Sequence, residues 1–223
     1  MKKDRIDKRA IVQRDNETYA IVPHMAGGIC TPELLRKIAD VAEKYGAKAI
    51  KVTESQRIAI VGIKEEDLDR IWKDLGVKPA AAIGMCVRSI KFCPGKAFCR
   101  LAQQDTISIG TKLDEIFHGY SLPGKMKIAI SGCPNCCTES WVRDIGLIGT
   151  KKGWNVVVGG SAGSRPMIGH LIAKGLSDEE AMDLVRRIIE KFKEYGKPRR
   201  LGRLIEEIGI ERFKEEVGIS HKE

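Results

Sequence analysis

Three cysteines fall within five positions in the segment SGCPNCCTES, which covers residues 131–140. They are Cys133, Cys136 and Cys137. Two more cysteines, Cys93 and Cys99, lie earlier in the chain, in the stretch CPGKAFC. Adjacent cysteines make a poor disulfide framework, and the chain's total of seven cysteines is odd. The pattern therefore predicts thiolate chemistry, either catalysis or metal binding.

The two cysteine segments have the spacings C-x5-C and C-x3-C. Structural zinc sites usually pair cysteines about two to four residues apart, and no histidine is suitably placed beside these segments. Four thiolates from two loops suit a 4Fe–4S cluster, which is larger than a single ion and accepts wider spacing. Buried free cysteines remain the simpler interpretation for Cys30 and Cys86.

Composition and charge limit the class of protein. The chain has 223 residues, 43% of them hydrophobic and 31% charged, with a net charge of +9. No apolar stretch approaches the roughly 20 residues that span a bilayer, and the basic N-terminus lacks the apolar core of a signal peptide. These features predict a cytoplasmic protein with no membrane association.

The positive charge predicts an anionic partner without saying which one. Nucleic acid is disfavoured, because aromatic residues make up only 5% of the chain and no basic patch is interleaved with them. A solvated basic surface is the simpler interpretation of the charge alone.

The first part of the chain, residues 1–78, predicts a ferredoxin-like split β-α-β unit. Thr31 and Pro32 form a helix start, and Gly46 ends that helix. Residues 1–17 are charged and are expected to be an irregular arm. The expected elements are strands over 19–22, 48–53 and 57–61, and helices over 32–45 and 64–75.

The second part, residues 79–223, is expected to be a separate α+β domain packed against the first. Ser177 and Glu180 form a capping box that opens a long amphipathic helix ending near Tyr195. Strands are expected over 126–131, 145–150 and 155–159, and short helices over 201–207 and 211–217. The four histidines are scattered and are interpreted as structural or surface residues: His24, His118, His170 and His221.

Five stretches of the chain resemble the sirohaem- and 4Fe–4S-containing sulfite and nitrite reductases. They are GGICTPELLRKIADVAEKYG, KVTESQRIAIVGI, VRSIKFCPGKAFCRLAQQDT, LPGKMKIAISGCPNCC and WNVVVGGSAGSRP. The resemblance implies a ferredoxin-like half-domain followed by a 4Fe–4S and sirohaem domain with C-terminal helices. Larger members of this family contain two copies of the unit and this chain contains one, as in a single-unit, low-molecular-weight assimilatory-type sulfite reductase. It would act alone or as a homodimer.

The resemblance also implies the ligands of both cofactors. The 4Fe–4S cluster would be held by Cys93, Cys99, Cys133 and Cys137. Cys137 would also bridge the cluster to the sirohaem iron. The remaining residues implied to contact the sirohaem are Asn135, Gly160 and Arg165.

Cys136 departs from the family pattern, which more often has a small residue there. It is either a small buried filler or an alternative ligand.

Four cations match positions that line the open face of the sirohaem in the family, where they bind the anion and help to deliver protons: Arg57, Arg88, Lys125 and Lys127. Residues two apart in a strand point the same way, so the two lysines are expected to reach one pocket. A surface charge is the competing interpretation, and it is stronger for the lysines than for Arg88. Ser55 stands where many members have arginine, which leaves the carboxylate-binding set incomplete.

The activity expected from the resemblance is the six-electron reduction of sulfite to sulfide. GCPN is closer to the sulfite-reducing members, whereas QRI and CRLAQQDT are close to the nitrite-reducing ones, so reduction of nitrite to ammonia is the near alternative. A non-catalytic sirohaem and iron–sulfur electron-transfer subunit is a further alternative, and a cluster-bearing nucleic-acid-binding protein is a more distant one. No flavin or nicotinamide motif is present, so electrons are expected from a separate ferredoxin or flavoprotein.

Overall fold

The computed structural model describes residues 1–219 and divides into two compact units, Met1–Gly84 and Met85–Glu223. His221 lies outside the described residues. Among residues 1–219, no helix combines the length and the apolar character needed to cross a lipid bilayer.

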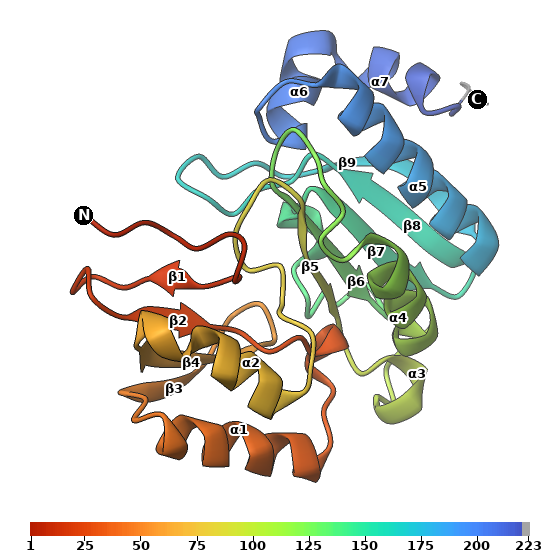
Figure 1. Cartoon of the computed structure of the whole chain (residues 1–223). Coiled ribbons are helices and arrows are strands. Elements are labelled where there is room, and N and C mark those ends of the chain that lie inside the picture. The colour runs from red at the N-terminus through yellow and green to blue at the C-terminus, as the bar shows by residue number, and fades with distance from the viewer. Residues whose placement is uncertain (220–223) are drawn as a thin grey trace. The chain divides into compact units, whose positions relative to one another are not determined.

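The first unit is a four-stranded antiparallel sheet with two helices on one face (Figure 1). The strand order is β1-β2-β4-β3. The strands are β1 (Ile11–Val12), β2 (Tyr19–Ile21), β3 (Ala49–Val52) and β4 (Ile58–Ile63). The helices are α1 (Pro32–Lys44) and α2 (Leu68–Leu75), and 3-10 turns cover Ala26–Gly28 and Glu65–Asp67. This is the predicted ferredoxin-like half-domain.

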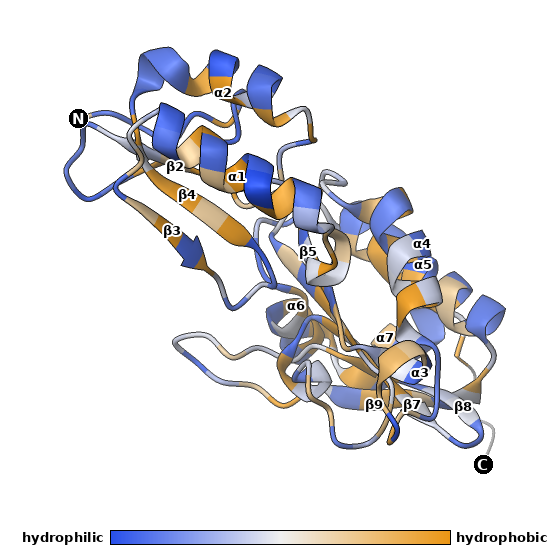
Figure 2. Ribbon diagram, turned by 90° about the horizontal axis from the view of Figure 1, so that it is seen from below, coloured by the Kyte–Doolittle hydropathy of each residue, from blue (hydrophilic) through white to orange (hydrophobic). Residues whose placement is uncertain are grey.

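Local sequence signals determine where α1 begins and ends. The Thr31 hydroxyl accepts a hydrogen bond from the Leu34 amide at 3.3 Å, and Pro32 is the first helical residue. Gly46 follows the helix with φ of 62°, a left-handed conformation that glycine adopts at little cost. In Figure 2, β4 is hydrophobic along most of its length, whereas α1 and α2 carry both hydrophilic and hydrophobic bands. The apolar bands form the core against the sheet.

The expectation of an irregular arm over residues 1–17 holds for most of the segment but is wrong at β1, where the chain joins the sheet. Ile11 pairs with Ala20 across β1 and β2, and Ala10 is fully buried. Arg5 forms ion pairs with Asp7 and Glu65. A two-residue strand is too short to produce a recognisable alternation, so the sequence pattern gave no sign of it.

The second unit has a five-stranded sheet in the order β5-β6-β7-β8-β9. Its strands are β5 (Val87–Phe92), β6 (Met126–Ser131), β7 (Ile145–Thr150), β8 (Gly153–Val158) and β9 (His170–Leu176). β5, β6 and β7 are parallel, and β7, β8 and β9 are antiparallel. The predicted bounds of β6 and β7 are confirmed, whereas β5 and β9 were not predicted.

Helices α4 (Thr106–Phe117) and α5 (Asp178–Tyr195) cover one face of this sheet, α4 over β5 and β6 and α5 over β8 and β9 (Figure 1). The predicted capping box is confirmed: the Ser177 amide donates to Glu180 Oε2 at 2.8 Å, and the Glu180 amide donates to Ser177 Oγ at 3.2 Å. α4 was not predicted. The helices are α3 (Gly95–Phe98), α4 (Thr106–Phe117), α5 (Asp178–Tyr195), α6 (Leu201–Ile208) and α7 (Ile210–Glu216), with a 3-10 turn over Ser140–Val142.

Candidate functional site

Both cysteine loops leave the sheet at the same edge. Cys93 directly follows β5, and Cys133 lies two residues beyond the end of β6. The two strands are parallel neighbours in which Phe92 lies opposite Ile130. Since the carboxyl ends of adjacent parallel strands meet at one edge, the two cysteine loops begin side by side.

Hydrogen bonds join the two loops. The Gly132 amide donates to Cys93 Sγ at 3.1 Å, and the Cys93 amide donates to the Ile130 carbonyl at 3.2 Å. The Gly132 carbonyl accepts from the amides of Gln103 and Gln104 at 2.6 and 3.0 Å. The segment after the C-x5-C loop is therefore fixed to the start of the C-x3-C loop.

Close packing at this point requires glycine. A Cβ on Gly132 would lie 3.3 Å from the Gly95 Cα, and a Cβ on Gly95 would lie 2.3 Å from Thr106 Oγ1. Gly95 also has φ of 56°. Thr106 is fully buried, and its hydroxyl donates to the Cys93 carbonyl at 2.5 Å. There is thus no room for a side chain at Gly95, and a side chain at Gly132 would make a tight contact.

The four candidate ligands are free thiols with different exposure. Cys133 is buried, Cys93 and Cys99 are half-buried, and Cys137 is exposed. α3 is a single turn, and the Cys99 amide donates to the Gly95 carbonyl at 2.9 Å at its end. Among residues 1–219, no three histidine, cysteine or acidic side chains gather closely enough to hold one metal ion.

These residues fit a 4Fe–4S cluster. The donor set is four thiols from two adjoining loops, and each thiolate of such a cluster binds a different iron. The Gly132 amide that donates to Cys93 Sγ is the kind of hydrogen bond to sulfur that stabilises a ligating thiolate and tunes a cluster's potential.

Cys136 occupies a constrained turn between the candidate ligands. It has φ of 50°, its amide donates to the Cys133 carbonyl at 3.2 Å, and its carbonyl accepts from the Glu139 amide at 2.7 Å. Burial raises the pKa of the Cys136 thiol, and the neighbouring Cys133 raises it further. Cys136 itself is half-buried.

Two buried cations that the sequence analysis missed lie next to the two loops and share an exposed carboxylate. Lys91, on β5 two residues before Cys93, is 8% exposed, and its ammonium lies 3.4 Å from Glu139 Oε2. Arg143 is also buried and forms an ion pair with the same carboxylate. Glu139 follows Cys137 by two residues and has φ of 61°. The sequence of β5, VRSIKF, contains two cations and gave no clear signal that Lys91 is buried.

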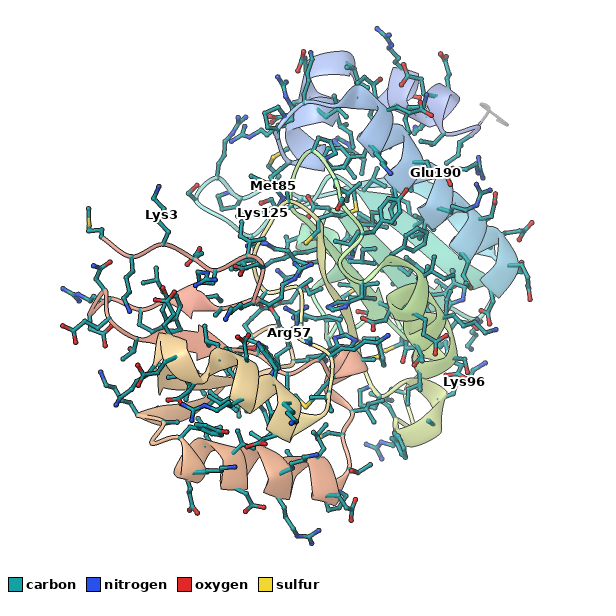
Figure 3. The ribbon with its side chains drawn as sticks, viewed as in Figure 1. Lys3, Arg57, Met85, Lys96, Lys125 and Glu190 are labelled. Carbon is teal, nitrogen blue, oxygen red and sulfur yellow. The ribbon has the colours of Figure 1, made fainter. Side chains whose placement is uncertain are left out.

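Three of the predicted cations lie in the second unit. Arg88 is half-buried on β5, and Lys127 is half-buried on β6, where its amide donates to Asp144 Oδ2 at 2.8 Å. Lys125 is exposed directly before β6 (Figure 3) and lines a hollow of about 190 Å³. Lys127 does not line this hollow, because β6 begins only at Met126 and strand alternation does not extend to Lys125.

The positions predicted to contact sirohaem have different surroundings. A Cβ on Gly160 would lie 2.4 Å from the Trp141 carbonyl, so this position requires glycine. Arg165 is exposed, lines the same hollow as Lys125, and contacts Glu206 at 2.8 Å. Asn135 is exposed on the turn that follows Cys133.

Arg57 belongs to the first unit, where it ends the hairpin turn before β4 (Figure 3). Its carbonyl accepts hydrogen bonds from the amide and the hydroxyl of Thr53 at 2.8 and 3.0 Å. The residue is 7% exposed and lines a hollow of about 330 Å³ together with Gly27, Gly28 and neighbouring residues. Ser55 is half-buried in the same turn.

Two family models match the chain. The model described as the nitrite/sulfite reductase ferredoxin-like half domain matches residues 11–77, and the model of the nitrite and sulphite reductase 4Fe–4S domain matches residues 83–223. The second match covers more than half of the chain.

Among curated proteins, the chain is 43% identical over 211 residues to the assimilatory-type sulfite reductase of Nitratidesulfovibrio vulgaris, covering 94% of this chain and 97% of that protein. It is 39% identical over 185 residues to the nitrite reductase [NAD(P)H] of Bacillus subtilis, covering 83% of this chain but 23% of that protein. The chain thus matches nearly the whole length of the sulfite reductase but only about a quarter of the length of the nitrite reductase.

Among solved structures, the NirA protein of Mycobacterium tuberculosis aligns with a TM-score of 0.80 at 22% identity, covering 92% of this chain and 42% of that chain. A dissimilatory sulfite reductase I aligns with a TM-score of 0.81 at 17% identity, covering 92% of this chain and 70% of that chain. At these identities the likeness shows a shared fold.

Proposed function

The chain belongs to the nitrite and sulfite reductase family, and from this membership we propose that it reduces sulfite to sulfide by six electrons at a centre of 4Fe–4S cluster and sirohaem. The observation that supports this most directly is the pair of adjoining loops that bring Cys93 and Cys133 to one edge of the sheet, with an amide donating to the Cys93 sulfur at 3.1 Å. The relative that matches along 97% of its own length is named a sulfite reductase.

In this proposal the cluster ligands are Cys93, Cys99, Cys133 and Cys137. When bound, the cluster and the sirohaem would pass on electrons from the external donor and provide an iron at which an oxyanion can bind. The side chain of Cys137 is the exposed one of the four, which suits a thiolate shared with a second metal.

The chain's own cations would bind the substrate and supply protons. Arg57, Arg88, Lys125 and Lys127 are the proposed set. Fixed positive charges stabilise the negative charge of the oxyanion, and the three oxygens of sulfite leave as water, which consumes protons. Asn135, Gly160 and Arg165 are proposed to contact the sirohaem, as the family resemblance implies.

Nitrite is the second candidate substrate, because the nitrite reductase of Bacillus subtilis is 39% identical over 185 residues. Both substrates are small oxyanions that the same cations would bind. The chain spans only 23% of that protein, so the match concerns the reducing unit alone. Sulfite is preferred because the sulfite reductase relative is matched almost completely.

Electrons are proposed to come from a separate ferredoxin or flavoprotein. A homodimer is proposed as an alternative to a monomer, with some cations serving the partner's site. The seven cysteines are free thiols, which fits a cytoplasmic location where thiols stay reduced.

The test begins with anaerobically purified full-length protein. We expect the optical bands of an isobacteriochlorin and about five irons per chain. In an activity assay with a reduced dye as the electron donor, the protein should reduce sulfite faster than nitrite. Colourless protein, or protein that holds zinc at these thiols, would contradict the proposal.

A matched pair of variants tests the ligand assignment. Cys137→Ser should lose the optical bands of the sirohaem, whereas Cys136→Ser should retain these bands and the turnover of sulfite. The reverse result would make Cys136 the ligand. If the haem iron carries a sixth protein ligand that sulfite cannot displace, the non-catalytic electron-transfer role replaces the enzymatic one.

A further inference from the structure

Lys91 points to the face of the second unit's sheet that lies opposite α4. Its neighbour Phe92 points to the helix face, because a Cβ on Gly110 of α4 would lie 2.4 Å from Phe92 Cδ1. Successive side chains of a strand point to opposite faces, so Lys91 is directed away from α4. The residue is nevertheless buried. A buried ammonium needs a partner, and this one reaches a carboxylate of a cysteine loop.

The register of β5 and β6 places Lys91 between Lys127 and the cysteines. Lys91 pairs with Ala129, and Lys127 lies two residues earlier on β6, so both lysines point to the same face of the sheet. Cys93 continues the ladder beyond β5, because its amide donates to the Ile130 carbonyl at 3.2 Å. Residues two apart in a strand are separated by about 6.6 Å along it. Lys91 is therefore the nearer of the two lysines to the cysteine loops.

Lys91 also connects the two cysteine loops. It precedes Cys93 by two residues, and its Nζ lies 3.4 Å from Oε2 of Glu139, which follows Cys137 by two residues. Arg143 Nη2 contacts the same carboxylate oxygen. The ammonium is thus held between a residue next to the first candidate ligand and a residue next to the last.

The turn that carries Glu139 is fixed by buried hydroxyl groups. Ser131 Oγ lies 2.7 Å from Thr138 Oγ1 and 3.0 Å from Ser140 Oγ, and all three residues are buried. The Glu139 amide donates to the Cys136 carbonyl at 2.7 Å. The carboxylate therefore projects from ordered backbone, and the protein itself sets the position of the ammonium that it holds.

We propose that Lys91, held in place by Glu139, stabilises the negative charge that the 4Fe–4S cluster gains on reduction and thereby raises the cluster's reduction potential. This inference rests on the proposed function, because it requires a cluster at the four cysteines. The reduction adds one electron from the external donor, moves no proton and neither forms nor breaks a covalent bond. A cation that lies beside the ligand loops and is shielded from water favours the more negative state.

The surroundings of Lys91 distinguish it from the four cations proposed to bind the substrate. Its ammonium is buried and paired with a carboxylate. This arrangement suits a permanent charge beside the cluster, whereas a group that binds and releases an anion must exchange its partner in each cycle.

The experiment is a redox titration of the anaerobically purified full-length protein. Dithionite reduces the cluster through dye mediators, and EPR measures the reduced form. Lys91→Met keeps an unbranched side chain but removes the charge. At a fixed potential, we expect the ratio of reduced to oxidised cluster to fall at least tenfold, which is a shift of about 59 mV to more negative potential for one electron. Lys91→Arg keeps the charge and should titrate as the wild type does.

Glu139→Gln separates an electrostatic role from damage to the loop. It removes the negative charge but keeps the size of the side chain and an oxygen acceptor, so the potential should shift in the positive direction. Lys174→Met is the matched control and should titrate as the wild type does, because Lys174 is an exposed lysine on β9, at the other edge of the same sheet. The iron content of each variant shows whether the cluster is retained.

The proposal is overturned if Lys91→Met titrates at the same potential as Lys174→Met, or if Lys91→Met and Glu139→Gln shift the potential in the same direction. If Lys91→Met retains no iron, Glu139→Gln decides alone: a positive shift supports the proposal, and no shift or a negative shift overturns it. All of these results leave the proposed function standing, whereas wild-type protein that holds no iron would refute both.

Discussion

The buried carboxylate of Asp144 should be a main determinant of stability in the second unit. It is fully buried and accepts hydrogen bonds from Arg200 at 2.8 and 2.7 Å and from the Lys127 amide at 2.8 Å. Burial raises the pKa of Asp144, and the Arg200 guanidinium opposes that rise. The pair thus joins β6, the residue before β7 and the start of α6.

The expected cost of Asp144→Asn follows from this geometry. An asparagine offers one carbonyl oxygen and would direct its NH₂ group at another donor, so at least one of the three hydrogen bonds is lost. Removing one partner of a buried ion pair costs about 3–5 kcal/mol. Because the Arg200 side chain is 23% exposed and regains some hydration, we expect the lower end of that range, about 3 kcal/mol, or a fall in Tm of about 6–12 °C.

The assay is urea unfolding of the full-length chain, followed by circular dichroism, for Asp144→Asn, Arg200→Gln and the double variant. A coupling free energy of about 2 kcal/mol is expected from this cycle, because the two side chains act as one unit. Asp183→Asn is the control: Asp183 also pairs with arginines but is exposed, and its loss should cost less than about 1 kcal/mol. Additive effects of the two substitutions, or a cost for Asp144→Asn no larger than the control's, would refute this reasoning.

Three further substitutions test other parts of the chain. Gly95→Ala should lower the iron content of the purified protein, because the new Cβ would lie 2.3 Å from the buried Thr106 hydroxyl. Gly46→Ala is the control and should keep its iron, because Gly46 has a similar φ of 62° but no atom within 4 Å of the added Cβ. Equal iron content in both variants would contradict the packing argument. Burial, together with the hydrogen bond to Glu216, raises the pKa of Tyr195 to about 12. Since an unfolded phenol titrates near pH 10, the stability that Tyr195 supplies is complete below about pH 10 and is lost between about pH 10 and 12. Tyr195→Phe should flatten the unfolding free energy over that window in denaturation measurements, and an unchanged slope would refute the assignment. Ser177→Ala removes the capping box of α5 and should cost about 1 kcal/mol in urea unfolding; a loss below about 0.3 kcal/mol would show that packing alone holds this helix.

The parts of the fold that were predicted are those with strong local signals. The bounds of α1 follow from Thr31 and Pro32 at its start and from Gly46 after its end. Each of these residues acts only on the helical turn nearest to it. The cysteine pairs were predictable for a similar reason, because thiol spacing within a loop is itself the chemical signal. The family resemblance then supplied what the residues alone left open.

The parts that were missed depend on contacts between distant segments. β5 carries Arg88 and Lys91, so its sequence shows neither clean alternation nor a continuous apolar run. It is a strand because it pairs with β6, and Lys91 is buried there beside Glu139 of another loop. Lys91 and Glu139 are 48 positions apart in the chain, and the sequence does not show that the Lys91 ammonium lies 3.4 Å from Glu139 Oε2.

The chain's net charge of +9 illustrates the same limit for the anion sites. Composition gives the excess of cations but not their distribution, and many surface cations here are neutralised within one helical turn, as Arg186 is by Asp183. Around the hollow that Lys125 lines, the carboxylates do not neutralise all the cations. Asp144 pairs with Arg200, and Arg165 and Arg203 share Glu206. Where an anion binds therefore depends on which carboxylates the fold places behind the cations, and that placement is set by tertiary structure.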